Sequence, residues 1–158
     1  MRVEQLMTKQ VKSCSADDTL DRAAQLMWDN DCGCLPVCAG DGVNRAVGVI
    51  TDRDVCMSAL FQGRPLRELR VADAMARQLQ ACRPRDSLSD VETTMRQARI
   101  RRLPVVDEQG AVIGMIALAD LAREAARQST AARQEITETE VGDTLAAICE
   151  PAVERRAA

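Results

Sequence analysis

Residues 48–54 read GVITDRD, and residues 114–120 read GMIALAD, so that a glycine, two apolar residues and an aspartate recur 66 positions apart. Upstream of each stretch lies a second match, in which LPV at 35–37 is repeated at 103–105, a spacing of 68. The spacing changes between Gly42 and Gly48, in a turn rich in glycine and asparagine, where chains tolerate changes of length. An indel confined to a turn indicates a duplicated unit, and the repeat constrains the fold more than any single motif.

Each repeat shows the same order of secondary-structure signals, read from the alternation of period-2 and helical hydrophobic spacing. In the first repeat we predict a short strand at 11–14, a helix at 20–30, strands at 34–38 and 47–50, and a helix at 52–60. In the second we predict a short strand at 79–82, a helix at 87–98, strands at 103–106 and 112–116, and a helix at 118–128. The sequence therefore predicts an α/β (α+β) protein of two β-α-β-β-α repeats, packed with pseudo-twofold symmetry around equivalent clefts.

The tail has no counterpart in the first repeat. We divide the chain into a first repeat (1–66), a second repeat (67–128) and a polar linker with a C-terminal helix (129–158). Val141, Leu145 and Ile148 recur at helical spacing and predict that helix. It either docks on the core or serves as a partner-binding appendage, and we favour docking.

Composition excludes several classes of function. Net charge is −3 among 158 residues and only one Trp and one Phe are present, which disfavours a protein that binds nucleic acid. There is no histidine, so the usual general base, most nucleophile triads and the commonest zinc ligand are missing. No apolar run approaches the length of a membrane span and no export signal is recognised, so we expect a cytoplasmic protein with seven reduced cysteines.

GVITDRD has a pattern that suits an anionic ligand with a ribose. Gly48 lets the backbone approach a ligand closely, and Val49 offers an apolar surface for a flat base. Thr51 stands at a helix start, where its hydroxyl and the free backbone N–H groups suit phosphate, and Asp54 can accept the hydroxyls of a ribose. The alternative is that Thr51 only caps the helix and Asp54 only complements its dipole.

Three arginines follow the helix at 87–98. Arg99, Arg101 and Arg102 are either a solvated surface near a helix C-terminus or phosphate ligands. Because we place Arg101 and Arg102 in one strand, where side chains alternate, we expect only one of them to point into a given cleft.

The cysteines of the motif Cys32-x-Cys34-x-x-x-Cys38 suggest zinc or redox sensing. A zinc site lacks histidine and a second Cys-x-x-Cys arm, and these positions align with ordinary strand positions of the second repeat. We therefore interpret them as small buried apolar residues and expect no metal.

Taken together, the repeated h-P-V and G-h-h-T-x-x-D motifs closely resemble the CBS domain, a module found in tandem pairs, over residues 1 to about 125. The C-terminal helix makes the chain similar to bacterial stand-alone CBS-pair proteins, including the hypoxic-response type. The resemblance implies clefts that bind adenosine derivatives such as AMP, ATP or S-adenosylmethionine. It implies a first cleft formed by Val49, Thr51, Arg53, Asp54, Leu79, Gln80, Ile100, Arg101 and Arg102. It implies a second, weaker cleft formed by Thr8, Lys12, Ser13, Cys32, Cys34, Ala117 and Asp120.

In the second cleft Ala117 replaces the phosphate-binding hydroxyl, so the cleft is expected to be empty or to prefer a less charged adenosine compound. The resemblance further implies a regulatory nucleotide sensor that is not an enzyme and has no catalytic residues or cofactor. AMP or ATP is the expected ligand, with NAD or S-adenosylmethionine as further candidates. It implies a homodimer, for which the exposed sides of helices 20–30 and 88–98 are the surfaces to examine, and an unidentified protein partner. The alternative function is an interaction module with vestigial clefts that works through its helices and tail.

Overall fold

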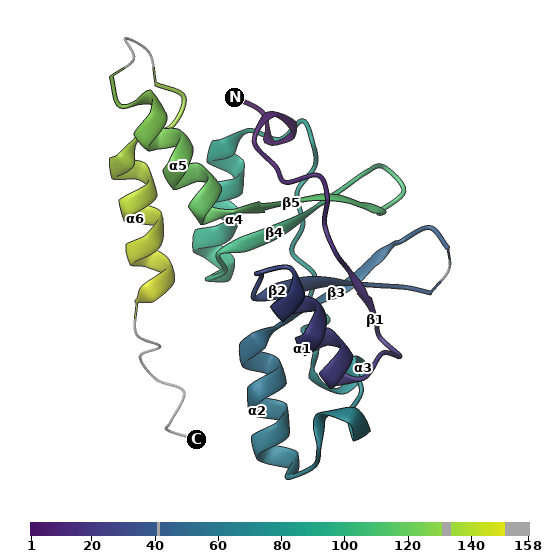
Figure 1. The fold of residues 1–158 in the computed structure, drawn as a ribbon. Coiled ribbons are helices and arrows are strands. Elements are labelled where there is room, and N and C mark those ends of the chain that lie inside the picture. Colours follow the sequence, from purple (N-terminus) through teal and green to yellow (C-terminus); the bar gives the residue numbers. More distant parts are fainter. Residues whose placement is uncertain (41, 131–133, 151–158) are drawn as a thin grey trace.

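The computed structural model describes residues 1–40, 42–130 and 134–150. It contains two similar α/β halves and a C-terminal helix, which confirms the predicted fold class (Figure 1). The first half holds β1 (Cys14–Ser15), α1 (Leu20–Asp29), β2 (Cys34–Cys38), β3 (Ala46–Thr51) and α2 (Asp52–Gln62), preceded by the 3-10 turn η1 (Val3–Gln5). The second holds α3 (Val71–Ala74), α4 (Leu88–Ala98), β4 (Arg102–Val106), β5 (Val112–Ala117) and α5 (Leu118–Gln128), preceded by the 3-10 turn η2 (Leu66–Glu68). The last helix is α6 (Glu138–Cys149).

Each half is built on an antiparallel hairpin whose register is the same. In the first, Val37 lies opposite Gly48; in the second, Val105 lies opposite Gly114. Both hairpins have an irregularity one residue later, where the strands run into the turn. β1 adds a parallel strand beside β2, so the first sheet has the order β1-β2-β3, whereas the second sheet consists of β4 and β5.

The predicted strand at 79–82 is wrong in its length. Only Cys82 pairs with the hairpin, through an isolated parallel bridge to Val105, and the residues before it form no strand. The matching strand at 11–14 is also shorter than predicted, because pairing starts at Cys14. The remaining residues of both segments belong to no strand.

A pseudo-twofold axis passes between the tips of the two hairpins. The Ala46 N–H donates to the carbonyl of Gly110 at 3.0 Å, and the Val112 N–H donates to the carbonyl of Asn44 at 3.1 Å. Ala46 and Val112 are 66 residues apart, and so are Asn44 and Gly110, so the pseudo-twofold axis converts one hydrogen bond into the other. The duplication seen in the sequence is therefore also a symmetry of the backbone.

The halves exchange their short N-terminal segments. Val3 of η1 is fully buried in the core of the second half, together with Leu88 and Leu103. Val71 of α3 is fully buried in the core of the first half, together with Leu20. Figure 1 shows the N-terminus beside the second half before the chain crosses to β1. Each repeat thus completes the apolar core of the other, which makes their separate folding unfavourable.

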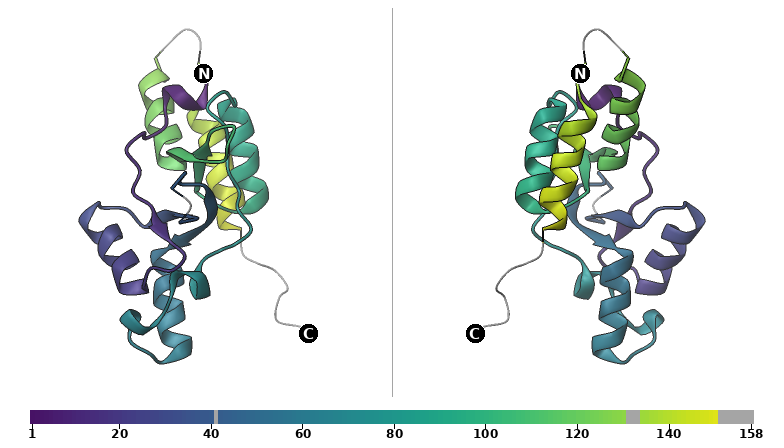
Figure 2. Two further views of the ribbon diagram at one scale, coloured as in Figure 1. Left: turned by 90° about the vertical axis from the view of Figure 1, so that its right-hand side faces the viewer. Right: turned by 90° about the vertical axis from the view of Figure 1, so that its left-hand side faces the viewer.

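Helix α6 docks on the second half, as the sequence analysis favoured. It lies against α4 and α5 in both views of Figure 2. Ile136 and Val141 join the second core, and the fully buried Thr144 hydroxyl donates to Glu92 Oε1 at 3.1 Å. An N-terminal capping box, in which the Thr137 hydroxyl accepts the Glu140 N–H, fixes the start of the helix.

Candidate functional site: two clefts between the repeats

A cleft of about 300 Å³, here called cleft 1, opens where β3 meets α2. Both halves contribute to its wall, as the sequence analysis predicted. Seven predicted residues line it, namely Val49, Thr51, Arg53, Gln80, Ile100, Arg101 and Arg102. Asp54 and Leu79 were also predicted for this site but do not contribute to the wall of the cleft.

Thr51 and Asp54 form a capping box at the start of α2. The Thr51 hydroxyl donates to Asp54 Oδ2 at 2.7 Å, and the Thr51 N–H donates to the same oxygen at 2.9 Å. The Asp54 N–H in turn donates to the hydroxyl at 3.2 Å. The capping role that the sequence left open as an alternative is therefore real. It does not exclude a ligand, because Thr51 lies on the cleft wall and both side-chain bonds of Asp54 fall on one oxygen.

The same capping box occurs at the start of α4, away from the cleft. There the Ser87 hydroxyl donates to Asp90 Oδ2 at 2.7 Å and accepts the Asp90 N–H at 3.2 Å. Neither residue lines cleft 1. The pattern of a hydroxyl followed by a carboxylate three residues later thus stabilises a helix start wherever it occurs, and only position in the fold makes one copy a candidate site.

Gly48 allows the two halves to meet at the base of cleft 1. A Cβ at this position would lie 2.5 Å from the carbonyl oxygen of Ala76, which is backbone and cannot turn aside. The contact exists because Val49 and Ala76 exchange backbone hydrogen bonds of 3.1 and 2.9 Å. The close approach expected of this glycine is therefore toward the other repeat, and it brings Ala76 into the cleft wall.

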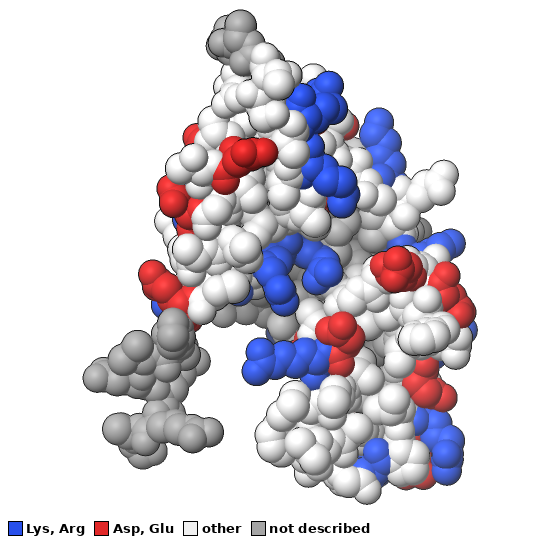
Figure 3. Space-filling model, turned by 60° about the vertical axis from the view of Figure 1, so that its left-hand side comes forward, with Lys and Arg blue, Asp and Glu red and all other residues white. Residues whose placement is uncertain are grey.

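Arginines dominate the polar wall of cleft 1. The expectation that only one of Arg101 and Arg102 points into a given cleft is wrong for cleft 1, since both line it together with Arg99. β4 begins only at Arg102, and Arg99 ends α4 in the left-handed conformation with φ 53°, so strand alternation does not govern Arg101. Figure 3 shows Lys and Arg side chains gathered in the hollow between the two halves.

The equivalent hollow in the other half, here called cleft 2, measures about 360 Å³ and lies where β5 meets α5. Six predicted residues line it, and Ser13 does not: the six are Thr8, Lys12, Cys32, Cys34, Ala117 and Asp120. Asp120 accepts the Ala117 N–H at 2.8 Å and forms an ion pair with Arg123, a cleft residue that the sequence analysis missed. Its carboxylate is therefore already neutralised by a neighbour, in contrast to Asp54.

Several other lining residues were missed, although the repeat itself could have indicated them. Thr8 was predicted for cleft 2, and adding 68 gives Ala76, which lines cleft 1. Cys34 was predicted for cleft 2 and Arg102 for cleft 1, and each of these equivalent residues lines both clefts. Arg99, which the sequence left open as a phosphate ligand, also lines cleft 1. The further residues missed are Gly33, Asp52 and Gln78 in cleft 1, and Gln10, Val11, Asn30, Asp31, Met115 and Ala119 in cleft 2.

Three of the buried cysteines are neutral thiols near neutral pH. Burial raises the pKa of Cys34 to about 11, and burial raises the pKa of Cys14 and of Cys82 to about 12. A thiol with such a pKa is a poor nucleophile and a poor metal ligand near neutral pH. Across residues 1–40, 42–130 and 134–150, no three Cys, Asp or Glu residues are grouped so that they could hold a metal ion.

Comparison with known proteins agrees with this geometry. The family model "CBS domain" matches the chain twice, at residues 3–59 and 71–127. The CBS domain-containing protein YhcV of Bacillus subtilis is 39% identical over 120 residues, which cover 76% of this chain and 82% of that protein. None of the helices within the described residues is long and apolar enough to cross a membrane.

Two solved structures show the same fold. The crystal structure of Hypoxic Response Protein I with two coordinated zinc ions is 28% identical, with a TM-score of 0.70, over 78% of this chain and 98% of that chain. The CBS domain pair of protein MJ0100, in complex with 5-methylthioadenosine and S-adenosyl-L-methionine, is 22% identical, with a TM-score of 0.69, over 78% of this chain and 98% of that chain.

Proposed function

The chain belongs to the CBS-domain family, and from this premise we propose that it is a regulatory module, not an enzyme, which senses an adenine nucleotide such as AMP or ATP bound in cleft 1. The observation that carries the proposal is the meeting of the Thr51 hydroxyl, the start of α2 and four arginines on one wall made by both repeats. A ligand that binds both repeats at once stabilises one relation between them, and that is how it would act on a partner.

The cleft offers a place for each part of AMP. The phosphate is held by the guanidinium groups and by the Thr51 hydroxyl, whose proton it would take over from Asp54 Oδ2. The first N–H groups of α2 are not available to it, because they already donate to Gly33, Asp52 and Thr51. Asp54 does not line the cleft, and we propose that the ribose reaches its Oδ1, the oxygen that the capping box leaves free. Val49 and Ile100 supply the apolar surface for the base. The bound 5-methylthioadenosine and S-adenosylmethionine of the MJ0100 pair support an adenosine derivative as the ligand class.

We propose that the module works in the cytoplasm, since all seven cysteines are free thiols. A thermal-shift screen with AMP, ATP, NAD and S-adenosylmethionine would rank these candidate ligands, because ligands that bind the folded state raise its melting temperature.

Calorimetry with AMP tests the assignment of cleft 1. Asp54→Ala is expected to weaken AMP binding by about 1.5–3 kcal/mol, the scale of a charged hydrogen bond. Asp90→Ala is the matched control, because it removes the same capping interaction from α4 at a place outside the cleft. The control should lose stability but bind AMP like the wild type. Equal AMP affinity in wild type and Asp54→Ala would refute the role of Asp54, and no binding of any adenosine compound would refute the proposed function.

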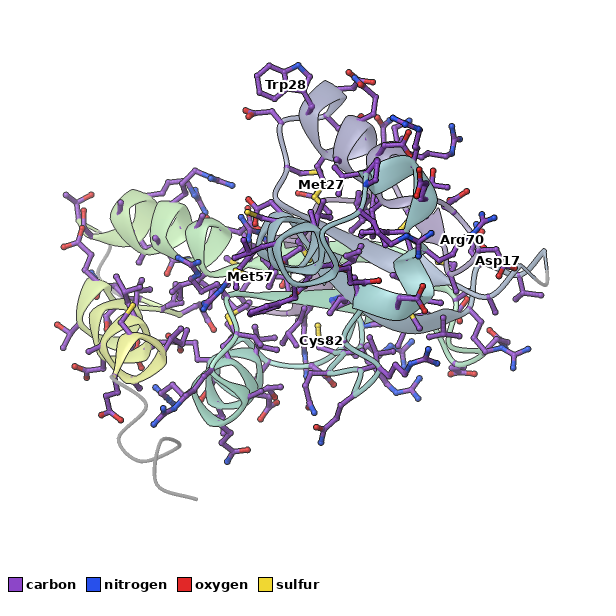
Figure 4. The ribbon with its side chains drawn as sticks, turned by 90° about the horizontal axis from the view of Figure 1, so that it is seen from below. Asp17, Met27, Trp28, Met57, Arg70 and Cys82 are labelled. Carbon is purple, nitrogen blue, oxygen red and sulfur yellow. The ribbon has the colours of Figure 1, made fainter. Side chains whose placement is uncertain are left out.

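A second function, as an interaction module, is favoured by the exposed face of α1 and α2. The only two aromatic residues of the chain lie on these helices: Trp28 on α1 is 84% exposed, and Phe61 on α2 is 79% exposed and follows the exposed Leu60. Figure 4 shows Trp28 pointing away from the ribbon, whereas Met27 points inward. Next to Trp28 lies a hollow of about 480 Å³ lined in part by Ala24, Met27 and Val55.

We propose that this face forms a homodimer, in which Trp28 of each copy enters the hollow of the other, as an isologous contact requires. The equivalent side of the second half is covered by α6, so the side of helix 88–98 expected as a second dimer surface is partly occupied.

Trp28→Arg places on α1 the residue that α4 has at the equivalent position, Arg96. We expect it to weaken the dimer by about 30-fold or more, as for an aromatic hot spot, measured by sedimentation equilibrium. Gln109→Arg adds the same charge on an exposed residue of the turn between β4 and β5, outside α1 and α2, and should leave the dimer intact. A wild-type chain that is monomeric at all accessible concentrations would contradict this proposal.

A further inference from the structure

Arg102 lies on the wall between the two clefts. Cleft 1 and cleft 2 share two lining residues, Cys34 and Arg102. Cys34 is buried and its thiol is neutral, so Arg102 carries the charge of the shared wall. No salt bridge or hydrogen bond of its guanidinium is found within the part of the chain that the structure describes. Its exposed side chain is therefore available to an anion in either cleft.

The two repeats differ at this point in a compensating way. In the first hairpin Cys34 lies opposite Thr51, and in the second Arg102 lies opposite Ala117. Residues directly opposite on neighbouring strands project from the same face of the sheet. Where the second repeat lacks the hydroxyl of Thr51, it thus has an arginine on the adjacent strand. A phosphate in cleft 2 that has no hydroxyl to meet would meet this guanidinium.

Cleft 2 depends on Arg102 more strongly than cleft 1 does. In cleft 1 the lining also includes Arg53, Arg99 and Arg101. The other lining cations of cleft 2 are Lys12 and Arg123, and Arg123 is paired with Asp120. Without Arg102, cleft 1 would therefore keep three arginines. Cleft 2 would keep Lys12 and Arg123, of which only Lys12 has no ion pair among the described residues.

We propose that Arg102 couples the two clefts, so that an anionic ligand in one cleft weakens the binding of an anionic ligand in the other. This inference rests on the proposed function, since it assumes that both clefts take adenosine derivatives. One guanidinium can give a bidentate pair of hydrogen bonds to only one phosphate, and a second phosphate near the same group adds repulsion between the two anions. Coupling of this kind is reciprocal: each ligand must weaken the other by the same factor.

The test requires that the two clefts be read and blocked separately. The methyl groups of Val49 and Met115, equivalent residues of the two repeats, line cleft 1 and cleft 2 and provide one NMR reporter for each. Ala76→Trp fills cleft 1 and Thr8→Trp fills cleft 2, again at equivalent positions whose side chains are exposed. AMP is the probe, and the uncharged ribosyl compound 5-methylthioadenosine, which has no phosphate, is the control ligand.

We expect AMP to bind cleft 2 about tenfold more tightly when cleft 1 is blocked, in Ala76→Trp, than when cleft 1 is saturated with AMP, in the wild type. The affinity of cleft 1 should rise by the same factor, here called the coupling factor, when cleft 2 is blocked in Thr8→Trp. In Arg102→Ala, AMP should bind more weakly, most of all in cleft 2, and the factor should fall to about one. Arg101→Ala should weaken cleft 1 but keep the factor, because Arg101 lines cleft 1 and not cleft 2. With 5-methylthioadenosine no coupling is expected.

Two results would overturn the coupling while leaving nucleotide binding in place. One is an AMP affinity of cleft 2 that does not depend on whether cleft 1 is filled or blocked. The other is a ratio of AMP affinities, between blocked and saturated states of the neighbouring cleft, that stays near ten in Arg102→Ala. If AMP, ATP and 5-methylthioadenosine bind to neither cleft of the wild type, the proposed function fails and the coupling fails with it. If a blocking variant does not fold, the wild-type titration still decides. Coupling separates the AMP midpoints of the two reporters further than unequal affinities alone, and this extra separation is absent with 5-methylthioadenosine. Two AMP curves that fit independent sites, with a ratio of midpoints that is unchanged in Arg102→Ala, reject the coupling.

Discussion

The two repeats share a backbone but differ in what covers their helices. In the second half α6 lies over α4 and α5, and polar groups are buried beneath it, among them Glu92, Glu124 and Gln128. In the first half α1 and α2 carry no such cover among the described residues, and Ala24 stands where the second repeat has Glu92. The hairpin cores, by contrast, are apolar in both halves.

This comparison separates two kinds of constraint. The apolar residues that fix the duplicated backbone have to stay similar, since each half completes the core of the other. Residues on the helix faces and at the cleft walls are not constrained in this way, and they differ between the repeats. Trp28 corresponds to Arg96, and Thr51 corresponds to Ala117. Differences between the repeats are therefore where a difference in function should be sought.

The largest effect is expected from loosening α6, which would make the second half resemble the first. Ile136 is 1% exposed and joins the core of the second half. Ile136→Ala should lower the free energy of unfolding by about 2–5 kcal/mol, the range for a buried isoleucine, measured by urea denaturation. Leu145→Ala is the control, because Leu145 on α6 is 44% exposed and its loss should cost much less. A cost below about 1 kcal/mol for Ile136→Ala would mean that α6 is not part of the folded core.

The equivalent glycines at the base of the clefts sharpen the comparison. A Cβ on Gly48 would lie 2.5 Å from the Ala76 carbonyl oxygen, whereas on Gly114 its nearest neighbour is the Met7 sulfur, at 2.7 Å. The methionine side chain can move, and the nearest backbone atom at Gly114, the carbonyl oxygen of Thr8, would be 3.0 Å from the Cβ, farther than that of Ala76. Gly48→Ala should therefore destabilise the protein by about 2–3 kcal/mol and Gly114→Ala by about 1 kcal/mol, in equilibrium unfolding. The reverse order would show that the two junctions are not packed as the structure describes.

The smallest effect concerns the carboxyl buried under α6. Burial raises the pKa of Glu92, so its ionised form is less favourable in the folded chain than in the unfolded chain. The contribution of Glu92 to the free energy of unfolding is most favourable below its unfolded pKa, near 4.5, and declines as the pH rises through its folded pKa. Glu92→Gln keeps an acceptor for the Thr144 hydroxyl and should raise the free energy of unfolding by about 1 kcal/mol at pH 7, with no gain at pH 4.

Thermal unfolding of wild type and Glu92→Gln at both pH values measures this difference directly. Glu140→Gln on α6 is a useful control: this exposed carboxylate caps the helix start, so its removal should destabilise the protein at pH 7. An equal gain from Glu92→Gln at pH 4 and at pH 7 would show that ionisation of Glu92 is not the cause.

Most of the fold could be predicted because the signals were local and occurred twice. The strand at Cys34–Cys38 was predicted with its observed bounds, and the helix that follows Thr51 begins at the predicted residue. The strand at 79–82 was overestimated, since pairing depends on whether a neighbour is present and not on the apolar residues of the segment. The exchange of Val3 and Val71 between the cores was not predicted at all, because nothing in a single segment tells which half it packs against.

The clefts were predicted in part for similar reasons. Thr51 and Ala117 were found from their motif, and Arg99 was one of three arginines considered as phosphate ligands, but Arg123 comes from a helix face that no motif marks. Asp54 was expected to open onto cleft 1, and the structure instead places its Oδ2 on Thr51, because a capping box satisfies the free N–H groups of a helix start without any ligand.

The amino-acid sequence by itself determined the duplication, the class and order of the elements and the starts of the helices at Leu20, Asp52 and Leu118, since hydrophobic period and capping residues act over a few neighbours. Only the tertiary structure decided which half each short segment completes, that α6 covers one helix pair and not the other, and that Arg102 stands between two clefts. These depend on contacts between residues far apart in the chain, and such contacts are settled by the packing of the whole molecule.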